Sequence, residues 1–577
     1  MANPSSTEKD MRLLSLPITH LIAAQVRGDV TAVEIVECYL RRAEQIHTAT
    51  NCFTCWVPEA LEEAIAADQF LRDNGKTLGC LHGIPCTIKD HYAMKGLPVT
   101  MGLKTLRDRM EASGGAHLDS VAVLALRAEG AIPIAKTNMT QHGDTWGGGN
   151  PAYGDTLNPW NTLRTPGGSS SGEGAAVGSS ASVFGIGSDV GGSVRCPAAF
   201  SGVAGLKPTA QRFSFGWGDG RTILNKPGDY GVMATGGPLA KTVDDLVQVL
   251  KACWSRTSPM LNIDTRVPRI PFDEQTLATT GPLTIGYHVG GGYTHPSPCP
   301  STVRCVERAI GALRDAGHHL VPFDPNEVVP WAELHPILLA EYGHGIRPDA
   351  DNKAKAPKQE REGSYSSKST DTAIDEIHPD LAGMAKASRG PGGLLPVATS
   401  TAEHHAIIAR RDQQRDMLSR HWRASGLDVL ICAAWAFPAP PVEEVRNLAP
   451  AVWTTQAWNY FDVPAGVVPA GRVTDDDLGQ TWDIEMDPPS VEPELRDACL
   501  RSREDSRGMP IALQIVGQPW REEMVLRAML EVERVVTPIA EELVANHHLL
   551  EPVARRSPAM GEKPLAVKPN DIEPLAR

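Results

Sequence analysis

Two clusters of glycine and serine have the residue types that an active site needs. Gly167–Gly172 has the sequence GGSSSG, and Gly191–Arg195 has the sequence GGSVR. Glycine lets backbone N–H groups approach a ligand closely, and serine hydroxyls serve as nucleophiles or hydrogen-bond partners. Between the clusters, Glu173–Ser179 predicts a short helix and Ser182–Ile186 a buried strand, which would allow the two clusters to meet. We therefore interpret this stretch as the active site.

Lys89 stands at the end of a predicted strand, where a lysine could take part in chemistry. It ends the apolar stretch Leu81–Lys89, which predicts a buried strand, and the carboxyl end of a strand is where an open α/β sheet usually carries functional groups. A lone lysine after a strand is ordinarily a solvated surface charge. With two serine clusters in the same chain, a lysine whose pKa is lowered by burial can instead accept a proton from a serine hydroxyl.

Other interpretations of the serine-rich stretch are weaker. A Gly/Ser-rich run is often a flexible linker, but Phe184 and Ile186 give this one apolar side chains to bury. Gly168–Gly172 also matches the G-x-S-x-G nucleophile elbow, with Ser170 at its centre. That motif follows a hydrophobic strand, whereas Thr162–Pro166 is polar and ends in proline. Neither a phosphate loop nor a dinucleotide fingerprint is present in this stretch.

Several motifs carry a resemblance to a known family. They are GIPCTIKD at Gly83–Asp90, TPGGSSSGEGA, GSDVGGSVRCPAAFSGVAGLKPT, NYFDVPAGVVP at Asn459–Pro469 and GMPIALQIVG at Gly508–Gly517. In this order they resemble the amidase signature family, in particular its fungal acetamidase type, and the Gly/Ser-rich part also resembles fatty acid amide hydrolase. The resemblance extends over most of the chain.

The resemblance implies a Ser-Ser-Lys triad. Ser193 would be the nucleophile, Ser169 the bridging serine after a cis Gly168–Ser169 peptide, and Lys89 the base. It also implies that backbone N–H groups stabilise the acyl oxygen as it becomes negative. The residues expected around the substrate are Gly143, Ser169, Val190, Gly191, Gly192 and Ser193. No metal and no cofactor is implied.

Three further features qualify this assignment. Asp189 and Arg195 flank the second cluster, and we expect them to pair and support the turn. His82, His91 and His142 lie near the motifs and invite a Ser-His-Asp interpretation, but no carboxylate partner can be assigned from sequence. Ser171 stands where the family usually has glycine. A positive φ there would strain a serine and would leave open which serine bridges.

The remaining elements predict an α/β fold. Helices are expected over 14–27, 31–47, 58–74 and 119–129, and the second of them begins with a capping box formed by Thr31 and Glu34. Strands are expected at 131–136 and, as the closing strands, at 459–468 and 511–516, and alternation continues after the signature. We predict a large, mixed, mostly parallel twisted sheet covered by helices on both faces. Residues 1–549 would form one domain with core signature 81–212 and a variable insert at about 348–388. Residues 550–577 are predicted to form a Pro-rich, disordered tail.

Composition excludes several classes of partner. The net charge of −14 argues against nucleic-acid binding, which requires clustered basic residues. Met1–Arg12 lacks the apolar run of a signal peptide or membrane anchor, so we expect a cytoplasmic protein. Eleven cysteines, an odd number in scattered positions, argue against a disulfide framework. The expected partner is a small-molecule amide, and a homodimer is compatible with the sequence.

The predicted function is amide hydrolysis through an acyl-enzyme at Ser193. The Gly-rich segment Gly143–Gly149, with Trp146 as its one large side chain, is expected to border the acyl pocket and to favour small, medium or aryl amides. The alternatives are acyl transfer to an acceptor other than water, as in amidotransferases, and hydrolysis of fatty or secondary-metabolite amides. A binding protein without activity is disfavoured because all three triad residues are present.

Overall fold

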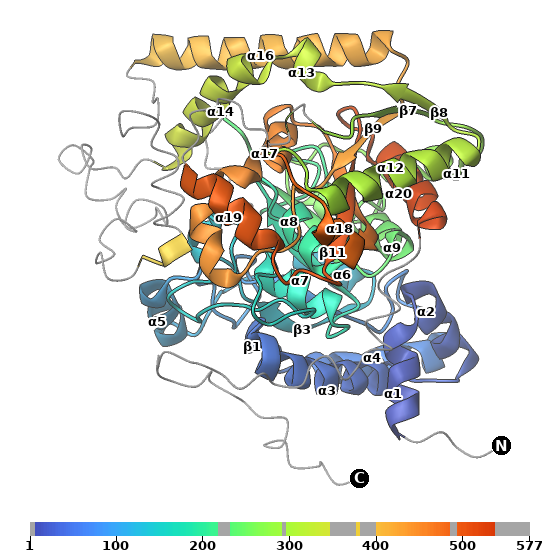
Figure 1. The fold of residues 1–577 in the computed structure, drawn as a ribbon. Coiled ribbons are helices and arrows are strands. Elements are labelled where there is room, and N and C mark those ends of the chain that lie inside the picture. Colours follow the sequence, from blue (N-terminus) through green and yellow to red (C-terminus); the bar gives the residue numbers. More distant parts are fainter. Residues whose placement is uncertain are drawn as a thin grey trace.

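An eleven-stranded mixed sheet runs through the centre of the protein (Figure 1). The computed structural model describes residues 6–216, 231–290, 293, 296–346, 377–380, 400–484 and 493–536. The strands are β1 (Phe53–Trp56), β2 (Ile84–Lys89), β3 (Ala131–Thr137), β4 (Phe184–Asp189), β5 (Ala204–Lys207), β6 (Thr235–Ala240), β7 (Thr284–Tyr287), β8 (His319–Pro322), β9 (Val429–Ala433), β10 (Ala465–Arg472) and β11 (Pro510–Val516).

The strand order is β1-β3-β2-β4-β6-β5-β10-β11-β9-β7-β8. Among the described strands, four of the ten neighbouring pairs are parallel and six are antiparallel. The predicted mixed α/β sheet is confirmed, but the expectation that it is mostly parallel is not. Parallel pairs form two blocks, β3-β2-β4 and β9-β7-β8. The first block brings the carboxyl ends of three strands to one edge, where the site lies.

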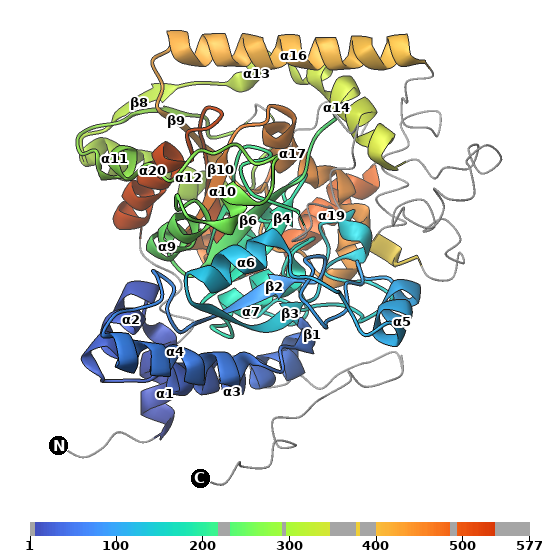
Figure 2. The same ribbon diagram turned by 180° about the vertical axis from the view of Figure 1, so that it is seen from behind.

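Helices surround the sheet. Figures 1 and 2 show α3 and α4 along one end of the molecule and the long helix α16 across the opposite end. The α-helices are α1 (Ser6–Ser15), α2 (Ile18–Arg27), α3 (Ala32–Thr50), α4 (Ala60–Asn74), α5 (Lys104–Ala112), α6 (Val121–Ala128), α7 (Ser171–Gly178), α8 (Arg195–Ser201), α9 (Val243–Cys253), α10 (Pro259–Asn262), α11 (Glu274–Ala278), α12 (Pro300–Asp315), α13 (Pro325–Val328), α14 (Trp331–Ile346), α16 (Thr401–Ala424), α17 (Trp453–Tyr460), α18 (Asp475–Gly479), α19 (Pro493–Arg503) and α20 (Glu522–Val535).

Local sequence signals explain several helix ends. The helix predicted over 14–27 is divided into α1 and α2 because Pro17, which carries no N–H group, stands before the first residue of α2. The capping box predicted at Thr31 and Glu34 is confirmed: the Thr31 side chain accepts from the N–H of Glu34, and the Glu34 carboxylate accepts from that of Thr31. Helix α4 ends at Gly75, which has φ +62°.

One predicted strand is wrong in its first part. Asn459–Val468 was expected to be extended, yet α17 continues to Tyr460 and β10 begins only at Ala465. Short apolar runs do not distinguish a buried helix from a buried strand by periodicity, and nearly all of the second half of α17 is buried. This difference matters because it places Asn459 on a helix that faces the site.

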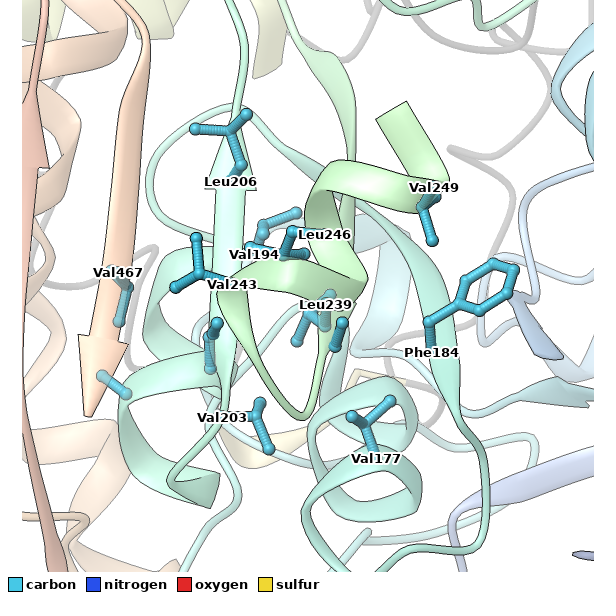
Figure 3. Close-up of a cluster of buried hydrophobic side chains, with 14 of the residues drawn as sticks. Val177, Phe184, Val194, Val203, Leu206, Leu239, Val243, Leu246, Val249 and Val467 are labelled. Atoms are coloured by element: carbon cyan, nitrogen blue, oxygen red, sulfur yellow. The ribbon is translucent and has the colours of Figure 1, made fainter. Parts of the chain in front are cut away.

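The core around the site is built from α7, α8 and α9 and from the central strands. Figure 3 shows Val177, Phe184, Leu239 and Leu246 converging between these elements. All four are at most 1% exposed. This apolar packing holds β4 and α7, whose ends carry the serines, in fixed relation to each other.

The predicted insert and the predicted tail lie mainly outside the described residues. Of the insert expected at about 348–388, only 377–380 is described, and the tail at 550–577 lies wholly outside. The division into domains therefore stays a prediction. Within the described ranges, no helix has the length and apolar character needed to cross a membrane. The cytoplasmic location stays a prediction.

Truncation of Leu239 tests this core. Leu239→Ala is expected to lower the free energy of unfolding by about 2 to 5 kcal/mol, because it removes apolar atoms and leaves a cavity. Leu163, which is 65% exposed, offers a matched control, and Leu163→Ala should stay within about 0.5 kcal/mol. Urea unfolding followed by circular dichroism measures both. Equal losses for the two variants would contradict the packing shown in Figure 3.

Candidate active site

Lys89 is buried at the end of β2, between β3 and β4. Its side chain is 0% exposed, and its Nζ donates to Ser169 Oγ at 2.7 Å and to Ser188 Oγ at 2.9 Å. Ser188 belongs to β4, and Ser169 lies in the turn that leads into α7. The structure thus brings the predicted lysine to one serine of the first cluster and reveals a second serine partner that sequence reasoning missed.

Burial changes the acid–base behaviour of this lysine. Loss of hydration lowers the pKa of Lys89 from its ordinary value to about 7, although Asp189, Glu173 and Asp90 act in the opposite direction. A lysine with a pKa near 7 is present in its neutral form to a large extent at neutral pH. Its two hydroxyl neighbours can then either accept a hydrogen bond from the amine or donate one to it.

The two serine clusters meet, as predicted. The backbone N–H of Ser170 donates to the carbonyl oxygen of Ser193 at 3.2 Å. The Gly168–Ser169 peptide is cis, as the family resemblance implied. Ser193 is 8% exposed and follows β4 in the short connection to α8, whereas Ser169 is 2% exposed. Lys89, Ser169 and the backbone of Ser193 therefore lie together in one buried region.

Ser170 and Ser171 occupy structural positions. Ser170 Oγ accepts from the N–H of Ser188 at 3.2 Å and lies 3.3 Å from the Ser188 carbonyl oxygen, to which it donates. Within the described residues no strand leads into this turn, so the nucleophile-elbow interpretation fails. Ser171 begins α7 without a positive φ, and its hydroxyl donates to the Asn138 carbonyl oxygen. Serine is thus accommodated there without backbone strain.

Asp189 and Arg195 form a fully buried ion pair. Arg195 Nη2 lies 2.9 Å from Asp189 Oδ1, and both side chains are 0% exposed. The guanidinium of Arg195 is the main reason that the pKa of Asp189 lies well below its usual range despite burial. Asp189 also accepts from the N–H groups of Gly192 at 2.8 Å and Val194 at 3.1 Å. The pair therefore holds the backbone on both sides of Ser193, as predicted.

Residues from the far end of the chain complete this network. Arg195 Nη1 donates to Gln514 Oε1 at 2.7 Å, and its Nη2 donates to Asn459 Oδ1 at 2.5 Å. Asn459 in turn donates to Asp189 Oδ1 at 2.9 Å. Sequence reasoning missed both amides. The available signal was Gln514 itself, a polar residue in the otherwise apolar run that forms β11.

The expected oxyanion donors are only partly available. The N–H of Gly192 is used by Asp189, so this group does not point to an acyl oxygen as the resemblance implied. The N–H groups of Gly191 and Ser193 have no acceptor within the described part of the chain. Gly192 has φ +130°, and a methyl group there would lie 2.2 Å from Thr455 Oγ1. Glycine is therefore required at this position.

Gly143 lies beside the first serine. With φ +82°, it would place a methyl group 3.5 Å from Ser169 Oγ, so this part of the wall is bare backbone. Trp146 differs from expectation. Its ring packs against Phe200 and Trp435, with centroids 6.3 and 5.1 Å away, and is 2% exposed. This is a core position, which does not support the expectation that Trp146 forms the wall of an acyl pocket.

Glu173 is a further residue that sequence reasoning missed. Its carboxylate is fully buried on α7 and accepts from Thr87 Oγ1 at 2.5 Å and Thr137 Oγ1 at 2.8 Å. Burial raises the pKa of Glu173 to about 8. A methyl group at Gly185 of β4 would clash with this carboxylate. Glycine at this position therefore leaves the space that the carboxyl group of Glu173 occupies. An acidic residue in a helix made otherwise of small residues was the signal for this position.

The histidines near the motifs take other positions. Burial lowers the pKa of His82, His91 and His142. None of the three hydrogen-bonds Ser169 or Ser193 among the contacts of the described residues. His82 Nδ1 accepts from the Leu78 N–H, and His91 packs on Tyr92. The Ser-His-Asp interpretation therefore has no geometric support.

Comparison with known proteins identifies the family. The sequence profile of the family Amidase matches residues 34–526. Fatty-acid amide hydrolase 1 from Sus scrofa is 31% identical over 553 residues, covering 91% of this chain and 86% of that protein. An acetamidase from Emericella nidulans is 30% identical over 325 residues, covering 55% of this chain and 57% of that protein.

A solved structure of a fatty acid amide hydrolase shares the fold. It has a TM-score of 0.73 and 24% identity, covering 92% of this chain and 86% of that one. The profile match spans most of the chain, and the serine clusters and buried lysine lie inside it. The chain therefore belongs to the amidase family, as a hydrolase of the amidase signature type.

Proposed function

We propose that this protein hydrolyses carboxamides through an acyl-enzyme at Ser193, with Ser169 and Lys89 as proton carriers. The observation that carries the proposal is the 2.7 Å contact between Lys89 Nζ and Ser169 Oγ in a turn hydrogen-bonded to Ser193. A serine hydroxyl is a weak nucleophile until a base removes its proton. A buried lysine with a pKa near 7 can be that base at neutral pH.

The proton would travel through the bridging serine. Neutral Lys89 takes the proton of Ser169, while Ser169 takes that of Ser193 as Ser193 Oγ attacks the amide carbonyl. The resulting lysine ammonium returns a proton through Ser169 to the leaving nitrogen, and the C–N bond breaks. Water then attacks the acyl-enzyme by the same relay, which releases the acid and restores Ser193.

Backbone donors would stabilise the tetrahedral intermediate. Gly191 and Ser193 have N–H groups free of acceptors in the described chain, and we assign them this role. The expected contribution of Val190 stays a prediction. Removing one such donor typically costs about 3 kcal/mol in the transition state. Gly192 takes a supporting role instead, because its N–H is used to hold the turn against Asp189.

Two observations bear on the acyl group of the substrate, and they favour different acyl groups. Gly143 leaves a wall of backbone beside Ser169, which favours small, medium or aryl acyl groups over long chains that need many apolar contacts. The similarity to fatty-acid amide hydrolase 1 over 91% of the chain favours fatty amides as the second candidate. Acyl transfer to another acceptor uses the same acyl-enzyme and differs only in what attacks it.

Covalent labelling tests the nucleophile. A fluorophosphonate should modify wild-type protein at Ser193, and Ser193→Ala should abolish labelling and hydrolysis because it removes the proposed nucleophile and leaves Ser169 and Ser188 hydrogen-bonded to Lys89. Ser201→Ala is a matched control, since Ser201 is a buried serine on α8 that donates to the Pro166 carbonyl oxygen. Peptide mapping identifies the site. Label on Ser170 in the Ser193→Ala protein would restore the nucleophile-elbow interpretation.

The pH dependence tests the base. Protonated Lys89 cannot accept a proton, so kcat/KM should fall about tenfold per pH unit below about 7 and level off above it. Lys89→Arg keeps the positive charge but cannot lose it, and it should remove most of the rate at every pH. Steady-state rates from pH 5 to 9 measure this. An acid limb that disappears in His142→Ala and persists in Lys89→Arg would identify a histidine base instead.

An acyl series tests the substrate. For amides from acetamide to a long-chain fatty amide, with one aryl amide included, kcat/KM should be largest for a short, medium or aryl acyl group. The physical reason is that a backbone wall supplies little apolar surface, while each buried methylene is worth about 0.8 kcal/mol where such surface exists. Hydroxylamine in the assay reports acyl transfer separately. A steady rise to the longest chain would establish the fatty-amide alternative.

A further inference from the structure

Three potential metal ligands gather away from the catalytic serines. The cluster consists of Asp155, His378 and Asp380, whose ligand atoms all lie within 4.8 Å of one another. His378 Nε2 is 3.2 Å from Asp155 Oδ1, and His378 Nδ1 is 3.7 Å from Asp380 Oδ2. The short yellow segment that carries the latter two lies between α5 and α19 in Figures 1 and 2.

A buried carboxylate in this cluster has no hydrogen-bond donor. The Asp380 side chain is 6% exposed, and its Oδ2 accepts no hydrogen bond from any described residue. The Asp155 side chain is 40% exposed, but its Oδ1 atom is buried and accepts no well-aligned hydrogen bond in the described chain. Burial of carboxylate oxygens without donors is costly unless a cation compensates them. Both oxygens are directed to the same histidine ring.

The neighbouring loop leaves room for the cluster. A methyl group at Gly147 would lie 2.2 Å from Asp380 Oδ2, and one at Gly149 would lie 2.0 Å from Asp155 Oδ1. Any larger residue at either position would displace the carboxylates. The histidine is also anchored, because the N–H of His378 donates to Gln141 Oε1 at 2.8 Å. The three side chains are therefore held together from two distant segments.

We propose that Asp155, His378 and Asp380 bind a divalent transition-metal ion of the Zn²⁺ class. One imidazole nitrogen and two carboxylate oxygens form a ligand set that Zn²⁺ accepts, with bonds of about 2.0 to 2.2 Å and a fourth position for water. Ca²⁺ and Mg²⁺ prefer sites made entirely of oxygen ligands. Side-chain rotations suffice to bring atoms that already lie within 4.8 Å onto one ion.

The site would be structural. It joins the segment 377–380 to Asp155, and both carboxylates pack on the loop Gly147–Gly149. That loop in turn packs on the catalytic turn: a methyl group at Gly168 would lie 2.3 Å from the Gly147 carbonyl oxygen. The ion would thus stabilise the packing around this loop. The loop contacts Gly168, the residue before Ser169, and the ion itself would not contact the serine. The inference does not depend on the proposed amide hydrolysis, since binding is measured directly.

Zinc titration of the full chain tests the site. After EDTA treatment and dialysis, wild-type protein should bind one Zn²⁺ by calorimetry, and its Tm should rise with Zn²⁺ concentration. Parallel titration with Mg²⁺ should have no effect. His378→Ala and the nearly isosteric Asp380→Asn should lose the bound ion and the Tm response. His318→Ala is the matched control, because His318 lies beside a single carboxylate, Glu531, at 3.7 Å.

Several outcomes would overturn the assignment. If wild-type protein binds none of Zn²⁺, Co²⁺, Ni²⁺ and Mn²⁺, the three residues form a hydrogen-bonded His–Asp cluster and not a metal site. Unchanged stoichiometry in both His378→Ala and Asp380→Asn would place the ion elsewhere. A Co²⁺ spectrum with thiolate charge transfer would place it on cysteines. Since the wild-type titration needs no variant, failure of a variant to fold does not leave the question open.

Discussion

The buried ion pair of Asp189 and Arg195 is the interaction on which the site depends. Neither charge is exposed, and each is compensated by the other and by several hydrogen bonds. Removing one partner of such a pair typically costs about 3 to 5 kcal/mol, because the other charge is left buried alone. The pair holds the turn that carries Ser193 and takes the N–H of Gly192 in doing so. The position of Ser193 thus depends on the Asp189–Arg195 ion pair, which itself takes no part in bond breaking.

Burial alone does not make a lysine a base, as the comparison of Lys89 with Lys136 shows. Both are 0% exposed, and burial lowers the pKa of both. Lys136 Nζ donates to the carbonyl oxygens of Asp90 and Pro98 and lies 3.9 Å from Asp90 Oδ1, so its surroundings are acceptors that favour an ammonium. Lys89 Nζ meets two hydroxyl groups, which can give up protons as well as accept hydrogen bonds. The groups that each Nζ contacts therefore explain the difference: Lys136 is suited to be a structural cation, and Lys89 is suited to proton transfer.

Much of the site was predictable because its signals are local. Serine clusters, a lysine after an apolar strand and a capping box at Thr31 are all read from neighbouring residues. Asn459, Gln514 and Glu173 were missed, since their roles arise from contacts with residues distant in sequence or from burial on every side. The direction of most central strand pairs was missed for the same reason: pairing depends on the order of strands across the sheet. Gly192 shows a further limit of prediction from sequence. Its N–H group donates to the Asp189 carboxylate, and no local pattern in the sequence indicates that contact.

The span of the Arg195 contacts has a consequence for biosynthesis. Gln514 follows Arg195 by 319 residues. At about 5 to 20 residues per second, the ribosome needs roughly 15 to 60 s to add that stretch after Arg195. Asn459 on α17 follows Arg195 by 264 residues and is added earlier, but until Gln514 on β11 is added the guanidinium lacks one of its two amide partners. The turn at Ser193 therefore gains its full set of contacts only when nearly all of the sheet has been synthesised.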